Sequence, residues 1–335
     1  MSSSLRRVWL GGTIALTLLA FAASIALAPP AGASAGRGLV ALLFIGSSAH
    51  VASTAWFYAV PEVRTFARAR PGRYVWAPLG LVAGSAVMAA LVAPDAFSWV
   101  LPPYFAWQFF HFQKQNVGLA ALASVAGSSG SVTPWERTAI TAAGVAGTVA
   151  LLAHPHLLDV DHDLRLDVLF PAAAVVFAAA VLAGLVALRR RDPADRPPAF
   201  LAVYGLSLLF FLPVFLFDSP YAAVAGLTMA HGFQYLLLVG LVAGGEPRGE
   251  RRLLGFAVLF NAAVLGGVAL AASSHLHDAG PAARSLYGAY LGVVMAHFVI
   301  DAGLWRFRDE FPRRFLTAHL PYLLVPAPRA ADRGR

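Results

Sequence analysis

Apolar runs of membrane-spanning length fill most of this chain, and short segments rich in arginine, proline and glycine separate them. A helix needs roughly 20 apolar residues to cross the hydrocarbon core of a bilayer. Hydrophobic residues make up 59% of the sequence and charged residues 13%, whereas ordinary soluble domains contain about 25% charged residues. The sequence therefore predicts an all-α, polytopic transmembrane helical bundle.

The ends of the apolar runs, placed at proline, glycine and charged clusters, define about ten predicted spans. The first span could be a signal peptide, because Arg6 and Arg7 precede it and Ala33-Ser34-Ala35 resembles a cleavage site. Its apolar run exceeds the roughly 7–15 residues of a signal-peptide core, so we favour a retained helix. The predicted spans are residues 8–28, 38–60, 74–94, 99–124, 135–153, 168–188, 199–217, 220–243, 253–272 and 285–305.

Arginine is distributed unevenly between alternate loops. With the N-terminus inside, the exterior segments carry only Arg37, Arg165 and Arg284, and the cytoplasmic segments carry most of the others. Because basic loops stay in the cytoplasm, we predict a cell (inner) membrane protein with both termini cytoplasmic. The net charge of +8 then follows from this orientation and indicates no nucleic-acid partner. Residues 1–305 form the predicted transmembrane bundle, and residues 306–335 form a basic cytoplasmic tail.

Cysteine is absent from the sequence. This absence excludes disulfides, iron–sulfur clusters, thiolate-ligated haem and covalently attached c-type haem. A metal ion in this chain would therefore be held by histidine, carboxylate or amide groups.

Four histidines fall within the predicted spans: His50, His111, His231 and His297. An ionisable group inside a bilayer is costly and rare, so it is a functional candidate by default. A single intramembrane histidine is often only a hydrogen-bond donor between helices. These four lie on spans two, four, eight and ten, which run in the same direction in the predicted topology. Their clustering favours a shared metal or haem site.

Polar residues three or four positions from each histidine lie on the same helical face. A ligating imidazole usually gives its second N–H to such a neighbour. Asp301 follows His297 by one turn and could be this acceptor or a ligand. The metal-ligand candidates are His50, His111, His231, His297 and Asp301, and the catalytic candidates are Asp301, Tyr235 and Gln108. Other polar neighbours are Ser47, Ser53 and Thr54 near His50, Gln115 near His111, and Gln234 near His231.

The two halves of the chain resemble each other in the spacing of their histidines. His50 and His111 are 61 residues apart, and His231 and His297 are 66 residues apart. The segments that begin His111-Phe112 and His297-Phe298 are also similar. This pattern favours a parallel internal duplication, spans one to four against seven to ten, with these histidines paired within each half. Such repeats commonly place their site at the repeat interface.

A multi-span protein whose candidate ligands are scattered intramembrane histidines resembles the membrane-integral non-haem iron oxygenases. It looks most like the Brp/Blh type, the β-carotene dioxygenases that release retinal. The resemblance rests on the number of spans, the length, and the His111-Phe112 and His297-Phe298 segments with polar residues close behind. The Pro-His-Gly-x-x-Asp segment of that family is not matched at Ala49-His50-Val51-Ala52. The resemblance implies an iron cofactor and an isoprenoid substrate.

The leading hypothesis is a membrane oxidoreductase with a non-haem iron centre held by the four histidines, with Asp301 as a fifth ligand or an orienting group. Imidazole and carboxylate suit Fe(II), which can activate dioxygen at an open site. The expected partners are membrane lipids, an apolar small-molecule substrate and an electron-transfer partner. Two alternatives stay open: a b-type haem electron-transfer protein with axial histidine pairs, and a proton- or metal-coupled transporter.

Overall fold

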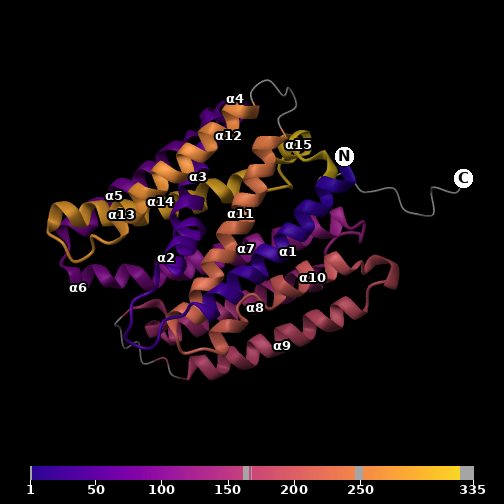
Figure 1. Ribbon diagram of the computed structural model, residues 1–335, viewed down its shortest axis with the longest axis horizontal. Helices are drawn as coiled ribbons and strands as arrows, with labels where there is room; N and C mark the ends of the chain where they lie inside the picture. The colour runs from indigo at the N-terminus through magenta and orange to yellow at the C-terminus, as the bar shows by residue number, and fades with distance from the viewer. Residues whose placement is uncertain (1, 161–165, 167, 246–251, 325–335) are drawn as a thin grey trace, which may run out of the picture. The chain divides into compact units, whose positions relative to one another are not determined.

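The computed structural model describes residues 2–160, 166, 168–245 and 252–324. Within these ranges the regular elements are all helices, and no strand occurs (Figure 1). The predicted all-α helical bundle is therefore confirmed.

Among the described residues, seven helical segments are both long and apolar enough to cross a membrane. Each of them coincides with a predicted span, and together they indicate a membrane protein. They are Ser4–Ala26, Arg37–Ala59, Gly72–Leu91, Leu169–Arg189, Tyr221–Gly244, Arg252–Ser274 and Pro281–Leu304.

The other three predicted spans differ from these seven. Helices α7 (Leu101–Ala126) and α8 (Pro134–Ala153) are long enough, but polar residues within them lower their mean hydropathy. Predicted span 199–217 is wrong as a single helix, because α10 (Pro198–Leu208) has only 11 residues. Pro213, which has no N–H to donate to a helix, lies in the 3-10 turn that follows. The total of ten spans stays a prediction.

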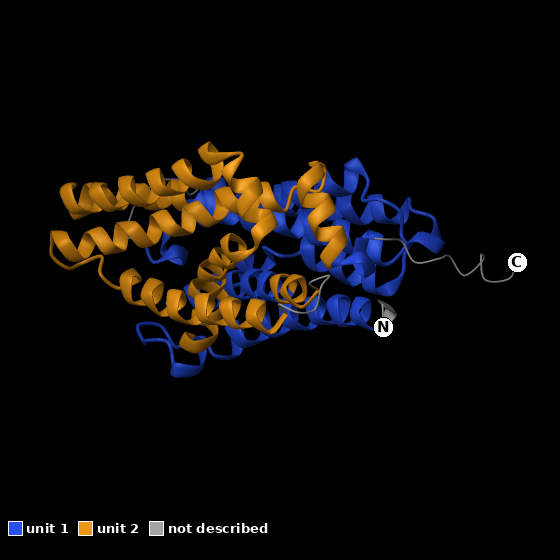
Figure 2. Cartoon of the chain, turned by 90° about the horizontal axis from the view of Figure 1, so that it is seen from above, with its two compact units in different colours: residues 1–39, 105–237, 320–335 blue, residues 40–104, 238–319 orange. Residues whose placement is uncertain are grey.

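The helices group into two compact units, which Figure 2 shows in different colours. Unit 1 comprises Met1–Leu39, Phe105–Leu237 and Leu320–Arg335, and unit 2 comprises Val40–Tyr104 and Leu238–His319. Each unit is assembled from segments far apart in the sequence. Neither unit coincides with one of the two predicted repeats, so the duplication and the single bundle over residues 1–305 stay predictions.

In unit 1, α8 and α9 lie side by side (Figure 1). The buried Glu136 in the first turn of α8 holds Arg191, which lies just beyond the end of α9, with 2.5 Å between Oε1 and Nε. Glu136 also closes a capping box with Thr133, which satisfies backbone N–H groups at the start of α8. The helices of unit 1 are α1 (Ser2–Ala26), α7 (from Phe105), α8, α9 (Leu169–Arg189), α10, α11 (Gly226–Gly244, up to Leu237) and α16 (Pro321–Leu324).

In unit 2, α5 and α14 lie side by side (Figure 1). Gly288 and Gly292, four residues apart on α14, lie so close to the backbone of α5 that a Cβ atom at either position would collide with it. Small residues at this spacing let membrane helices approach closely. This packing holds α14, which carries His297 and Asp301. The helices of unit 2 are α2 (Arg37–Phe44, from Val40), α3 (His50–Ser53), α4 (Pro61–Arg68), α5 (Ala77–Leu91), α6 (Pro94–Phe97), α12 (Arg252–Asn261), α13 (Gly267–Ser274), α14 (Pro281–Leu304) and α15 (Glu310–His319).

The predicted basic tail, residues 306–335, is helical in its first part. Helix α15 is amphipathic, because Phe315 and Leu316 are buried while Arg313 and Arg314 are exposed. Residues 325–335 lie outside the described part of the chain, and the cytoplasmic location of the tail stays a prediction.

Candidate metal centre

His50 lies where the second apolar helix changes its winding. A π-helical turn, Ile45–Ala49, leads into α3, which begins at His50, and a 3-10 turn, Thr54–Ala59, follows. A π turn inserts an extra residue into the helical ladder and is frequent at functional sites. It rotates the residues that come after it relative to an unbroken α-helix. The side chains of His50 and Thr54 are both buried in this segment.

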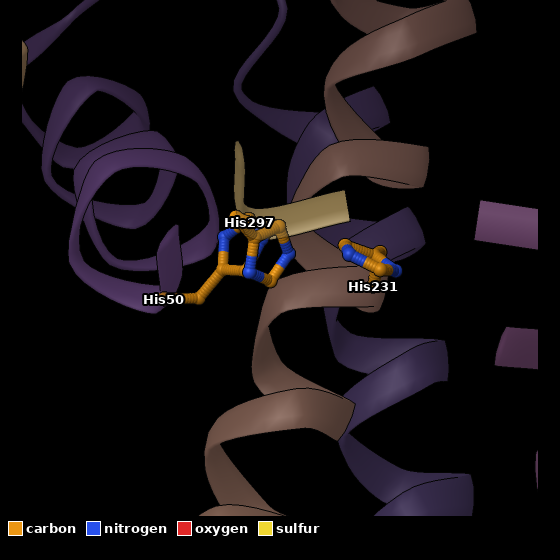
Figure 3. A group of neighbouring side chains, drawn as sticks. All are labelled: His50, His231 and His297. Carbon is orange, nitrogen blue, oxygen red and sulfur yellow. The ribbon is translucent and has the colours of Figure 1, made fainter. Parts of the chain in front are cut away.

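The rings of His50 and His297 meet within unit 2. Their centroids are 5.1 Å apart and their planes are inclined by 81°. Figure 3 draws both side chains, together with His231 of unit 1. Both residues of the pair are buried, at 3% and 1% exposure. Because a metal–imidazole bond is only about 2.0–2.1 Å long, two rings at this separation can ligate one ion with a small side-chain movement.

Each ring nitrogen of His297 has a polar neighbour. Nδ1 lies 2.7 Å from Oγ1 of Thr54, and Nε2 lies 3.6 Å from Oδ2 of Asp301. When Nδ1 carries the hydrogen and donates it to the Thr54 hydroxyl, Nε2 presents its lone pair on the side of Asp301. A metal ion bound at Nε2 requires this tautomer, in which the second nitrogen is held by an outer hydrogen bond. The opposite tautomer places the hydrogen between Nε2 and Asp301.

Asp301 is 3% exposed. A structural role for this carboxylate would pair it with Arg306 or Arg308, but these arginines lie 3.8 and 3.9 Å from the carboxylate of Asp309. Oδ2 of Asp301 lies 3.6 Å from Nε2 of His297, within ion-pair distance. A buried carboxylate is costly unless a cation or a proton compensates its charge. Asp301 therefore favours the binding of a cation beside His297.

The rings of His111 and His231 meet in the same way within unit 1. Their centroids are 5.0 Å apart and their planes are inclined by 74°. The ring of Phe112 stacks on His231 with a centroid distance of 4.1 Å. His231 is buried and His111 is half-buried.

A chain of side-chain amides surrounds this second pair. Gln115 donates from Nε2 to the backbone oxygen of His231 at 3.0 Å and to Oε1 of Gln234 at 2.9 Å. Gln234 in turn donates to Oγ1 of Thr17 at 2.7 Å. The chain joins α7, α11 and α1 of unit 1, as hydrogen bonds between polar side chains commonly do in membrane helices.

The contacts between histidine rings within each unit differ from the pairing predicted from sequence. His50 meets His297 and His111 meets His231, whereas the spacing in the sequence had paired them within each half. Tyr235 is buried on α11 and Gln108 is half-buried on α7. Their catalytic roles, and the single centre shared by all four histidines, stay predictions.

Sequence reasoning missed two features of these surroundings. It placed Thr54 beside His50 and did not predict that the hydroxyl lies against His297. It did not single out Thr17, although Trp9, Thr13 and Thr17 recur every four residues on an apolar helix. That spacing puts all three on one helical face and was the available signal.

Buried histidines in the described part of the chain form groups that could hold a metal ion. The donors are imidazole nitrogens and a carboxylate, with a threonine hydroxyl behind one ring. This set fits a divalent first-row metal, since imidazole suits zinc, copper, iron and nickel, and a carboxylate beside imidazoles suits Fe(II).

No protein-family model matches the chain, no curated protein matches it, and no solved structure matches it. The functional interpretation therefore rests on the chemistry of the site itself.

Proposed function

We propose that this chain is a membrane oxidoreductase that uses a non-haem iron ion and dioxygen to oxidise a lipid or isoprenoid. One observation carries the proposal: unit 2 brings the rings of His50 and His297 together and places Asp301 3.6 Å from Nε2 of His297. Two histidines and one carboxylate, with the remaining positions open, form a ligand set of Fe(II) oxygenases.

Bound iron would supply the activation of dioxygen. His50 and His297 would hold the ion through their imidazole nitrogens, and Asp301 would ligate it or balance its charge. Thr54 would accept the Nδ1 hydrogen of His297 and so fix the ring in the ligating orientation. The apolar helices around the site would exclude water and keep the substrate in register with the ion.

The substrate class follows from the depth of the site. A site within membrane helices is reached most easily by apolar molecules from the bilayer. If both oxygen atoms of dioxygen enter the product, the substrate supplies all the electrons. If one atom leaves as water, two further electrons have to come from an electron-transfer partner. The resemblance to Brp/Blh-type carotene dioxygenases favours the first course and an isoprenoid with conjugated double bonds.

Asp301 also favours a metal ion over haem b. With Nδ1 of His297 at the Thr54 hydroxyl, Nε2 is the nitrogen that would reach iron. A carboxylate oxygen lies 3.6 Å from this atom, and a carboxylate beside imidazoles suits a non-haem metal ion. The same buried imidazole–carboxylate pair is the observation that favours the remaining alternative, a proton- or metal-coupled transporter.

An oxidation assay in detergent tests the proposed function. Iron-loaded protein is incubated with an apolar polyene under isotopically heavy dioxygen, and the products are analysed by mass spectrometry. We expect heavy oxygen in the product with the unmodified protein and with His277→Gln, a change at a half-exposed histidine beside Asp278. We expect none with His297→Gln. Iron-loaded protein that oxidises no polyene or unsaturated lipid, but moves protons or metal ions across vesicle membranes, would favour the transporter.

We further propose that the protein lies in the inner membrane with both termini in the cytoplasm. The uneven distribution of arginine supports this orientation. Because the chain has no cysteine, a single introduced cysteine is a unique label. Ala194→Cys, exposed in the segment after α9, should react only after the membrane is opened. Ala279→Cys, exposed before α14, should react from outside. External labelling at position 194 contradicts the orientation.

A further inference from the structure

Within the described part of the chain, two buried polar groups of the first helix lack a hydrogen-bond partner. Trp9 is 0% exposed and Thr13 is 2% exposed. Neither Nε1 of Trp9 nor Oγ1 of Thr13 has a partner within the part of the chain that the structure describes. Inside a membrane protein such a group is costly, because bulk water does not replace the missing partner.

Trp9 and Thr13 are neighbours on one face of α1. Residues four apart in a helix have their Cβ atoms about 5–6 Å from each other. Thr17 continues the same face by one turn, and its hydroxyl accepts a hydrogen bond from Gln234 within unit 1. The two groups without a partner therefore lie at one end of a polar stripe whose other end is satisfied by protein.

Thr13 differs from other helical threonines of this protein. Thr17, Thr65 and Thr148 each donate their hydroxyl to the carbonyl oxygen four residues earlier, at 2.6, 3.0 and 2.9 Å. A threonine in a helix commonly satisfies its hydroxyl in this way. The carbonyl of Trp9 offers Thr13 the same acceptor, yet the Thr13 hydroxyl does not use it. This hydroxyl is therefore left without the acceptor that a helical threonine commonly uses.

We propose that the indole N–H of Trp9 and the hydroxyl of Thr13 together bind one acceptor oxygen atom. The indole is a donor only, and the hydroxyl can donate as well, so one oxygen with two lone pairs satisfies both groups. The oxygen belongs either to a buried water molecule or to the carbonyl group of an apolar small molecule. Buried waters typically make about three hydrogen bonds to groups that are otherwise unsatisfied. Both donors lie in unit 1, and the site does not depend on the proposed iron chemistry.

Nuclear magnetic resonance of the tryptophan indole groups tests the site in the full chain in detergent micelles. The Trp9 signal is identified as the one lost in Trp9→Phe. We expect its N–H proton in the downfield range of a hydrogen-bonded indole. Thr13→Val, which replaces the hydroxyl by a methyl group, should shift this signal, and Thr13→Ser should leave it near its original position. Thr148→Val is the matched control: it removes a buried hydroxyl that is satisfied within its own helix and should not move the signal.

The source of the oxygen is read from the same sample. A cross-relaxation peak between the Trp9 indole proton and water identifies a bound water. A carbonyl compound that solvent extraction and mass spectrometry recover from the unmodified protein, and not from Thr13→Val, identifies a small molecule. The proposal is overturned if the Trp9 signal of the unmodified protein has the position of an indole without an acceptor. This result requires only Trp9→Phe, the variant that assigns the signal. It is also overturned if Thr13→Val folds and leaves the signal unmoved.

Discussion

The two histidine pairs have nearly the same ring geometry and different surroundings. The ring centroids are 5.1 Å apart for His50 and His297, and 5.0 Å apart for His111 and His231. Both pairs join helices that are distant in sequence, and each pair lies within one compact unit. Ring proximity alone therefore does not distinguish a metal site from a packing contact.

The neighbouring groups make the distinction. At His297, one nitrogen faces the hydroxyl of Thr54 and the other faces the carboxylate of Asp301. At His231, the Phe112 ring covers one face of the imidazole, and the nearby amides form hydrogen bonds among themselves and to the backbone. A carboxylate favours a cation, whereas an aromatic face and neutral amides suit a neutral ring. We therefore expect the first pair to dominate metal binding.

The largest expected effect is at His297. His297→Gln removes the imidazole that meets His50, Thr54 and Asp301. Loss of a group that only hydrogen-bonds a metal ligand typically lowers metal affinity about 10–100-fold. Loss of the ligand itself should therefore lower it by more than about 100-fold. Metal titration of the purified protein measures it. His277→Gln, at a half-exposed histidine, serves as the control and should keep full metal content. Equal metal content in the two variants would remove His297 from the site.

The next effect is at Asp301. Asp301→Asn keeps the shape of the side chain and removes its charge, so metal affinity should fall at least about tenfold. Asp309→Asn is the matched control, because this carboxylate is partly exposed and lies near Arg306 and Arg308. If both variants keep full metal content and lose only thermal stability, Asp301 belongs to the scaffold.

A smaller effect is expected at Thr54. Thr54→Val removes the hydroxyl that lies 2.7 Å from Nδ1 of His297. It should lower metal affinity about tenfold, the smallest loss typical for a group that hydrogen-bonds a metal ligand. Thr54→Ser keeps a hydroxyl at the same position and should bind metal almost as the unmodified protein does. A serine variant as weak as the valine variant would show that the effect comes from packing and not from the hydrogen bond.

The smallest effect is expected in the second pair. His111→Gln should change metal affinity by less than about tenfold. This is a smaller change than the loss of a group that hydrogen-bonds a metal ligand usually causes. The same titration measures it beside His297→Gln. A loss as large as that of His297→Gln would abolish the distinction between the two pairs and favour the centre of four histidines predicted from the sequence.

The helical fold could be predicted from sequence because length and apolarity decide which segments cross a bilayer. The seven confirmed segments satisfy both criteria without help from tertiary contacts. The predicted span 199–217 is not one continuous helix, although its apolar run continues past Leu208, where α10 ends. Hydropathy does not register the backbone change before Pro213, since phenylalanine and leucine are apolar in helices and turns alike.

The site was predictable in its members and not in its contacts. His297 and Asp301 are four residues apart on one helix, so their proximity follows from helical geometry. The contact of Thr54 with His297 depends on how the segment after the π turn Ile45–Ala49 is rotated and packed against α14. Neither the π turn nor the packing of two helices from opposite ends of the chain leaves a periodic signal in the sequence.

Metal analysis with an absorption spectrum of the purified, unmodified protein tests the central claim most directly. We predict about one iron ion per chain, because the ligand set suits one Fe(II) ion, and no Soret band in the spectrum. A Soret band would instead assign the histidines to haem b. Protein that stays metal-free after incubation with Fe(II) under reducing conditions would contradict the account.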